Sequence, residues 1–365
     1  MSACKLILAL SLLFVATTAD AGCQRVAAPD QFNNTPPSWG DDSGPIVSGF
    51  IDSKRPSGGL FDLIHGVDLD SYNAVDHAQL ADCGGKFAIV RINQHNAAGQ
   101  DILDTLFSTN VENLAKHNIP AFPYYFLTLP PQLRDISKFS SPLTAVAEAQ
   151  YRKTYEDAGA KAAQQFIDLL TTAKYDIPLN EVAGLKGRFV SVDVEQSPSH
   201  PDTANTTAAR YYGTFYSFAV CSWVKTVTAK LPGLIPLLYT FPAVYGSYLA
   251  LAEPEAYACL HGLPVWVART YGNGWEAIRE TDPAHCTGSS SICNTDRLVQ
   301  KLCEIEGGNR CIIHQYTHRG TAIAIGKTPK GGIPPHIDMD RFYMSKTTNA
   351  NAGPQFVRAE DAFKP

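Results

Sequence analysis

Eight short stretches of β-forming residues recur along the chain, and helical stretches separate most of them. Most are continuously apolar rather than alternating, as expected of strands that are buried on both faces. They are GVDL (66–69), FAIVRI (87–92), PAFPYYFL (120–127), RFVSVDVE (188–195), LIPLLYT (234–240), VWVART (265–270), CIIHQYT (311–317) and HIDMDRF (336–342). Residue patterning predicts helices over 100–118, 143–173, 203–231 and 294–307.

Strands that alternate with helices in this way predict an α/β fold, specifically a TIM-like (β/α) barrel. The gaps between strands shorten toward the C-terminal end, so fewer helices are expected there. A doubly wound open sheet is the alternative. No Gly-x-Gly-x-x-Gly motif follows any of the stretches, so the sequence does not support a dinucleotide site of that fold.

Residues 1–21 have the pattern of a signal peptide. Lys5 precedes an apolar run, and Ala19 and Ala21 form a small-x-small cleavage site. The run is shorter than the ~20 residues that a spanning helix needs. Lipoprotein anchoring at Cys23 is the alternative, but Asp20 stands where an apolar residue would be expected. We therefore expect a secreted or periplasmic protein without a membrane span.

The rest of the chain divides by composition. Residues 22–60 are rich in Pro, Gly, Asp and Asn and predict an irregular lead-in, residues 61–345 hold the barrel, and residues 346–365 form a polar tail. The net charge of −5 argues against a nucleic-acid partner, which would require a basic surface. We expect a monomer.

Eight cysteines follow the signal peptide, and an even number in an exported chain favours disulfides. Local spacing suggests the pairs Cys286–Cys293 and Cys303–Cys311. A zinc site is the alternative, but the sequence contains no Cys-x-x-Cys motif to support it.

Carboxylates gather where three of the predicted strands end. In a barrel of this kind, the C-terminal ends of the strands form the catalytic mouth. The acids there are Asp68 and Asp70 on the first strand, Asp193 and Glu195 on the fourth, and Asp338 and Asp340 on the last.

The pair on the fourth strand has a spacing suited to catalysis. Asp193 and Glu195 are two residues apart, so they share one face of the strand at about 7 Å along the backbone. Repulsion between them would raise one pKa and keep a proton at neutral pH. A protonated acid beside an ionised one is what cleavage of a glycosidic bond needs. The alternative is a pair of acids on a solvated turn.

Aromatic and polar residues near the strand ends suggest a sugar site. Aromatic faces pack against sugar rings, and amides or guanidinium groups bind hydroxyls. The candidates are Tyr124, Tyr125, Trp266, Tyr271, Tyr316, Gln315 and Arg269, and core packing is the alternative for each of the aromatic rings.

In order along the chain, these motifs resemble glycoside hydrolase family 25, lysozymes that cleave the β-1,4 bond between N-acetylmuramic acid and N-acetylglucosamine. GVDLDSYN resembles the family's opening Gly-Ile-Asp-Val-Ser, PYYF its Tyr-His-Phe strand, and VSVDVE its Leu-Asp-Val-Glu. PLLYT, VWVARTYG, HQYTHRG and IDMDRF resemble the later strands. The resemblance covers residues 66–343.

This resemblance implies five β/α units followed by three further strands. It implies that Glu195 is the general acid and that Asp193 steadies the substrate's acetamido group or the developing charge. Asp68 and Asp338 would line the site. The acetamido oxygen of the substrate is often proposed as the nucleophile in this family, and no metal or cofactor is implied. The partner would be peptidoglycan or another N-acetylhexosamine polysaccharide.

The chain departs from the family pattern at three places. RINQH stands where the family has Lys-Ala-Thr-Glu-Gly, which puts Gln94 where an acid is common. Tyr125 replaces a histidine, and residues 127–143 with the helix after them look like extra material over the mouth. These differences bear on muramyl specificity more than on hydrolysis.

Three other functions are compatible with parts of the pattern. A chitinase would carry Asp-x-x-Asp-x-Asp-x-Glu, but Arg188 and Ser191 replace its first two acids. A non-catalytic glycan-binding barrel would fit Gln94 and Tyr125. A metal-dependent hydrolase could use ligands from the set His65, Asp68, Asp70, His336 and Asp338, although their spacing matches no recognised site.

Overall fold

A computed structural model describes residues 61–71, 75–82, 85–96, 99–182, 185–199, 206–268, 298, 301–305, 308–320 and 337–345. The expected signal peptide, lead-in, C-terminal tail and Cys286–Cys293 pair lie outside these residues. No helix within the described ranges is long and apolar enough to cross a bilayer.

Each of the eight predicted stretches corresponds to a strand. The strands are β1 (Phe61–Leu69), β2 (Phe87–Arg91), β5 (Ala121–Phe126), β7 (Leu185–Asp193), β8 (Leu234–Thr240), β9 (Val265–Ala268), β12 (Cys311–Gly320) and β13 (Ile337–Ser345). Parallel pairings run from β1 through β2, β5, β7, β8 and β9 to β12. β13 closes the ring, because it pairs antiparallel with both β12 and β1. The chain therefore has a TIM-like α/β fold.

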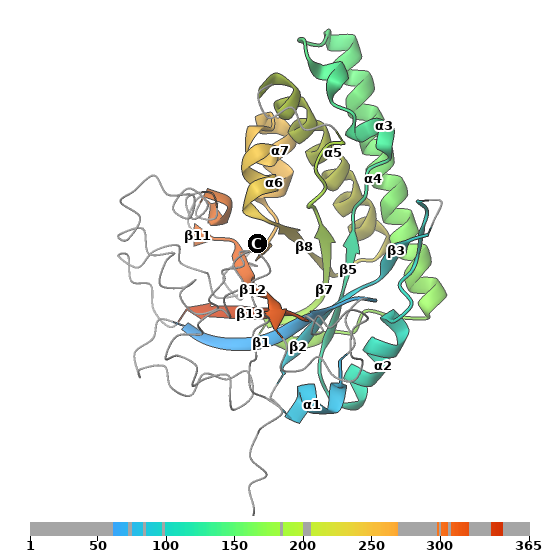
Figure 1. The fold of residues 1–365 in the computed structure, drawn as a ribbon, viewed down its shortest axis with the longest axis vertical. Helices are drawn as coiled ribbons and strands as arrows, with labels where there is room; N and C mark the ends of the chain where they lie inside the picture. The colour runs from blue at the N-terminus through green and yellow to red at the C-terminus, as the bar shows by residue number, and fades with distance from the viewer. Residues whose placement is uncertain are drawn as a thin grey trace, which may run out of the picture.

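The described helices pack on the outside of this sheet (Figure 1). They are α1 (His77–Asp82), α2 (Phe107–Lys116), α3 (Pro131–Arg134), η2 (Ser137–Phe139), α4 (Ala145–Ala173), α5 (Thr206–Lys230), α6 (Pro242–Ser247), η3 (Leu249–Leu251) and α7 (Pro254–His261). The long helices α4 and α5 lie side by side and extend past the ends of β5 and β7. Their close approach requires Gly159, where a Cβ atom would lie 1.9 Å from the carbonyl oxygen of Ala219.

Short strands complete the described part. β3 (Asn93–His95) and β4 (Asp101–Leu103) form a hairpin, β6 (Asn180–Val182) pairs with β7, and β10 (Glu304–Ile305) pairs with β11 (Gly308–Asn309). The prediction of a helix over 100–118 was wrong at its start. Residues 101–103 belong to β4, and Asp104 directs the turn before α2 by accepting a 2.9 Å hydrogen bond from the Leu106 amide.

The helix predicted over 294–307 is seen only in part. Residues 301–303 are helical and are followed directly by β10, while most of the remaining range lies outside the described residues.

The core has two layers, because successive residues of a strand point to opposite sides. Aromatic and aliphatic side chains such as Phe87, Phe122 and Phe189 fill the barrel interior. A second and larger layer lies between the strands and the helices, and it includes Val190, Phe166 and Trp223. This alternation decides which residues of each strand can reach the mouth.

Two disulfides are present among the described residues. The predicted Cys303–Cys311 pair is confirmed, with Cα atoms 5.0 Å apart. Cys221–Cys259 was not predicted, because its partners are 38 residues apart and meet only when α5 packs beside α7.

Candidate active site

The carboxylates at the strand ends point into the barrel. Val192 and Val194 belong to the outer layer under the helices, so Asp193 and Glu195 face the interior. On β1, Val67 and Leu69 lie in the same outer layer, which turns Asp68 inward. Asp193 and Asp68 are buried, whereas Glu195 is partly exposed, as a group that must meet a substrate has to be.

The third strand with acids, β13, brings Asp338 and Asp340 to the same interior. Asp338 pairs in register with Asp68 across β1 and β13. Asp340 pairs in register with Gln315 of β12 and accepts a 2.7 Å hydrogen bond from the indole nitrogen of Trp266. Acids from β1, β7 and β13 therefore converge on one opening.

Burial holds protons on the acids of β7. The pKa of Asp193 is raised well above its ordinary value by burial first and by the charge of Glu195 second, while Arg91 opposes the rise. Burial also raises the pKa of Glu195, and Arg91 again lowers it. One oxygen of Asp193 is buried and accepts no hydrogen bond within the part of the chain that the structure describes. The pair is thus arranged to keep a proton near neutral pH.

The pKa values of the acids on β1 and β13 are raised as well. The pKa of Asp338 is raised to about 7 by burial, then by the charges of Asp70 and Glu195. Burial raises the pKa of Asp68 and of Asp340 well above the ordinary range, and Asp338 adds to both shifts. An oxygen of Asp68 and one of Asp340 have no hydrogen-bond partner. Their electrostatic coupling places these groups in one cluster.

Arg91, the last residue of β2, supplies a positive charge to this cluster. Its guanidinium lies 3.0 Å from Asp70 and 3.0 Å from Asp104, and it donates a 2.9 Å hydrogen bond to the hydroxyl of Ser71. Sequence reasoning missed this residue. Its place at the end of the second strand was the available signal, since strand ends line the mouth.

Tyr239, near the end of β8, is a second residue that sequence reasoning missed. Its hydroxyl donates a 3.0 Å hydrogen bond to Gln315, and the amide of Gln315 reaches toward Asp68 at 3.4 Å. The charges of Glu195 and Asp193 add to the burial that raises the Tyr239 pKa, so its hydroxyl is close to both acids.

Of the predicted aromatic residues, Trp266 and Tyr124 join the carboxylates. The Trp266 ring packs 4.2 Å from the Tyr239 ring and 5.8 Å, edge-on, from the Tyr124 ring. Burial raises the pKa of Tyr124, and the charges of Asp68 and Asp70 raise it further. Both rings are almost fully buried, so they form the floor of the site.

Tyr125 is not brought to the cluster. Its neighbour Tyr124 points inward, so the Tyr125 ring points outward, where it stacks 6.1 Å from Trp223 of α5. Its hydroxyl donates a 2.7 Å hydrogen bond to Asp101 of β4. The described contacts of Tyr125 are thus on the outer side of the barrel, and its role in binding substrate stays a prediction. Gln94 lies in the β3–β4 hairpin, paired in register with Ile102.

Three other candidates are not placed. Arg269, Tyr271 and the Tyr316 side chain lie outside the described residues, as do the side chain of His65 and all of His336. Within the described part of the chain, no group of three or more His, Cys, Asp or Glu residues is arranged to hold a metal ion.

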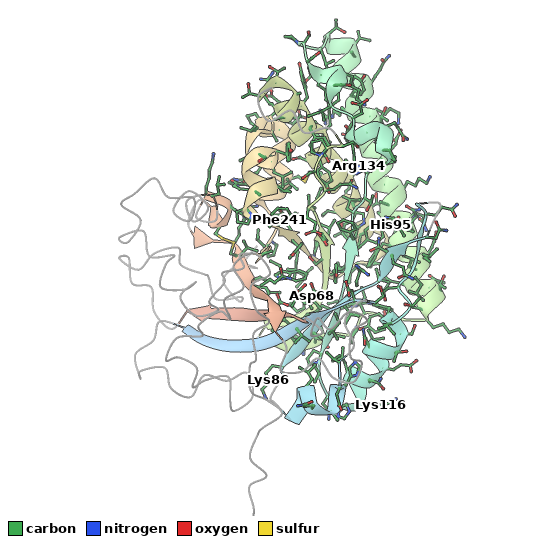
Figure 2. The ribbon with its side chains drawn as sticks, viewed as in Figure 1. Asp68, Lys86, His95, Lys116, Arg134 and Phe241 are labelled. Carbon is green, nitrogen blue, oxygen red and sulfur yellow. A yellow bond between two sulfur atoms is a disulfide. The ribbon has the colours of Figure 1, made fainter. Side chains whose placement is uncertain are left out.

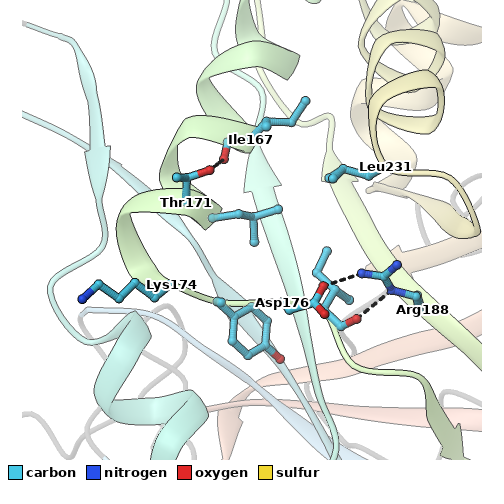
Figure 3. Close-up of a pocket in the computed structure, with 9 residues that line it drawn as sticks. Ile167, Thr171, Lys174, Asp176, Arg188 and Leu231 are labelled. Atoms are coloured by element: carbon cyan, nitrogen blue, oxygen red, sulfur yellow. Dashed lines mark hydrogen bonds and ion pairs between the residues drawn. The ribbon is translucent and has the colours of Figure 1, made fainter.

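A separate cavity of about 350 Å³ lies at the opposite end of the barrel (Figure 3). It is lined by the C-terminal end of α4, by residues 174–177 that follow this helix, and by Arg188 of β7 and Leu231. The Arg188 guanidinium in this cavity donates hydrogen bonds to the Asp176 carboxylate and, at 2.8 Å, to the carbonyl oxygen of Ile177. No cluster of acids faces this cavity, so the mouth remains the candidate active site.

No protein-family model matches the chain, and no curated protein matches it. Among solved structures, it is similar to the spore cortex lytic enzyme SleM of Clostridium perfringens (16% identity, 82% of this chain and 71% of that chain, TM-score 0.46). It is also similar to GHIP, a glycosyl hydrolase 25 of Streptococcus pneumoniae (15%, 82% and 90%, 0.42). A third is a family 25 lysozyme from Aspergillus fumigatus (13%, 77% and 93%, 0.41). Likeness of this extent decides neither activity nor substrate.

Proposed function

We propose that this chain is an exported glycoside hydrolase that cleaves β-1,4 bonds of peptidoglycan or of a related N-acetylhexosamine polymer. The observation that carries the proposal is the pair Asp193 and Glu195, which face the barrel interior with raised pKa values. Acids from two further strands, Asp68 and Asp338, surround this pair. The order of motifs along the sequence, which resembles glycoside hydrolase family 25, supports the substrate class.

In this mechanism Glu195 is the general acid. It is partly exposed, and burial raises its pKa, which favours the protonated form that can donate to the leaving glycosidic oxygen as the bond to the anomeric carbon breaks. Water then adds to the anomeric carbon and returns a proton to Glu195. The net change is addition of one water across one bond.

Asp193 orients the acetamido group whose oxygen attacks the sugar carbon, or, in its ionised form, stabilises the positive charge that develops there. Its side chain is fixed by burial at the end of β7, which is the condition for electrostatic stabilisation without reorganisation. Asp68 and Asp338 would hold sugar hydroxyls or the acetamido nitrogen. Tyr239 and Gln315 supply neutral hydrogen-bonding groups beside them.

We also infer that the barrel consists of five β/α units followed by three strands, β9, β12 and β13. The described helices α1, α2, α4, α5 and the α6–α7 pair each follow one of the first five barrel strands, which supports this count.

Two competing functions gain no support from the described residues. Gln94 and Tyr125 favoured the glycan-binding alternative, but the Tyr125 hydroxyl is bound to Asp101 on the outer side of the barrel. The chitinase motif would need an acid at Arg188, which instead pairs with Asp176 at the far end of β7.

The test is release of reducing sugar ends by the purified protein from peptidoglycan and from chitin oligomers. Cleavage of peptidoglycan that is unaffected by a chelator supports the proposal. Cleavage of chitin oligomers alone would move the substrate class to a chitinase. Binding of either glycan without release of reducing ends would contradict hydrolysis.

A further inference from the structure

Beyond the barrel, the chain leaving β5 runs beside the chain leaving β7. The Leu127 amide donates to the Asp193 carbonyl oxygen at 3.0 Å, and the Ser199 amide donates to the Arg134 carbonyl oxygen at 3.0 Å. Between them, the Leu129 amide donates to the side-chain oxygen of Gln196 at 2.5 Å. We call residues 127–134 and 194–199 the mouth wall. The segment 127–143, which the sequence predicts to lie over the mouth, therefore begins as one side of the mouth.

Three buried tyrosines fix the mouth wall to the long helices. Tyr216 donates to the Leu127 carbonyl oxygen at 3.1 Å and Tyr212 to the Gln196 carbonyl oxygen at 2.9 Å, both from α5. Tyr155 of α4 donates to the carbonyl oxygen of Leu133. All three tyrosine side chains are fully buried. A surface held in this way is pre-organised, so binding to it costs little ordering.

Arg134 ends the first strip of the mouth wall, at the last position of α3 (Figure 2). Its side chain is partly exposed, and its Nε atom is buried and donates no hydrogen bond to any other described residue. No ion pair forms between Arg134 and another described residue, whereas Arg91 is held between Asp70 and Asp104. A buried donor without a partner is uncommon in native proteins and points to a group that binds there.

The charge of Arg134 acts on the same surroundings as the acids. Burial raises the pKa of the Tyr216 hydroxyl, the charges of Asp193 and Glu195 raise it further, and the charge of Arg134 lowers it, so Arg134 acts electrostatically on the same hydroxyl as the two acids. Its backbone is bonded to Ser199, four residues beyond Glu195, or up to about 13 Å along an extended chain. A group bound by Arg134 would therefore belong to a sugar next to the one being cleaved.

We propose that Arg134 is a substrate-binding residue that takes a carboxylate carried by the glycan strand. A guanidinium binds a carboxylate through two parallel N–H···O bonds, which a neutral sugar cannot offer. The inference rests on the proposed function, because peptidoglycan is a glycan whose strands carry carboxylates. In peptidoglycan the carboxylate could be the lactyl group of the muramyl sugar or one on its stem peptide.

Binding is measured by calorimetry in a Glu195→Gln background, so that no ligand is consumed. The ligands are a peptide-free tetrasaccharide of alternating N-acetylglucosamine and N-acetylmuramic acid, the same tetrasaccharide with stem peptides, and neutral chitotetraose. Adding Arg134→Gln should weaken binding of an acidic ligand about 10-fold and leave chitotetraose unchanged. Weaker binding of the peptide-free ligand would identify the lactyl carboxylate as the group that Arg134 binds. Weaker binding of the peptide-bearing ligand alone would identify a carboxylate of the stem peptide.

Lys153→Gln is the matched control. It removes the same charge from the exposed face of α4, where Lys153 pairs only with Asp157, and it should change no affinity. If Arg134→Gln weakened binding of acidic and neutral ligands equally, or weakened binding of none of them, the proposed role of Arg134 would be overturned. Failure of the background protein to bind all three ligands would overturn it together with the proposed function. Binding as predicted, with no hydrolysis by the wild type, would overturn only the hydrolase.

Discussion

Asp68 and Asp338 occupy paired positions on adjacent strands, with β1 and β13 running antiparallel through the barrel wall. Two carboxyl groups so close together in a buried place cannot both ionise without a large electrostatic cost. Burial and then the charge of Asp338 raise the pKa of Asp68, while burial and then the charges of Asp70 and Glu195 raise the pKa of Asp338 to about 7. The candidate site therefore stores electrostatic strain that depends on pH.

This strain should appear as a fall in stability with rising pH. The folded protein holds a proton on Asp338 more tightly than the unfolded chain, so the free energy of unfolding decreases as pH rises from about 4 to about 7. Asp338→Asn removes that decrease. Urea unfolding should find the variant about 1 to 2 kcal/mol more stable than wild type at pH 8, with the two equal at pH 4. The same difference at both pH values would contradict the assignment.

Arg91 should set the pH range of activity. Its positive charge lowers the pKa of Asp193 and of Glu195, so Arg91→Gln should raise both and move the pH–rate profile to higher pH. Arg91→Lys retains the charge and should move the profile less. The groups that face Arg91 are Asp70, Asp104, Ser71 and Tyr124. A loss of rate with an unmoved profile would show that Arg91 is only structural.

Tyr125 and Tyr239 provide a comparison between the two sides of the sheet. Tyr125→Phe removes the hydrogen bond to Asp101, which should cost about 1 to 3 kcal/mol of stability and leave kcat/KM unchanged. Tyr239→Phe removes the hydrogen bond to Gln315 beside the acids and should lower kcat/KM about 10-fold. Steady-state kinetics with chemical unfolding measures both effects. If Tyr125→Phe lowered kcat/KM more than Tyr239→Phe, the site would lie on the outer side of the sheet rather than inside the barrel.

The strands of the barrel could be predicted because burial on both faces makes most of them continuous apolar runs. β3 and β4 could not, because each spans three residues and carries polar side chains such as Asn93 and Asp101. The Cys221–Cys259 disulfide depends on the packing of α5 beside α7, which no local spacing encodes.

The acids of β1 and β7 were accessible to sequence reasoning because they lie where their strands end. Asp338 and Asp340 lie near the start of β13 and reach the same opening because β13 runs antiparallel to β1. The same two-residue periodicity that placed Asp193 with Glu195 separates Tyr124 from Tyr125, and applying it would have excluded Tyr125 from the mouth. Arg91 was harder to assign, since its role depends on Asp104, a residue of the loop before α2 that only the fold brings near.

The role of Glu195 as the general acid is tested most directly by the rate at which Glu195→Gln cleaves peptidoglycan, together with its affinity for the same glycan. Glutamine keeps the size of the side chain but holds no transferable proton. If Glu195 is the general acid, the variant should lose a factor of about 10² or more in kcat and keep an affinity within a few-fold of wild type. A variant that cleaves at the wild-type rate would contradict the role of Glu195 as the general acid and, with it, the proposed mechanism.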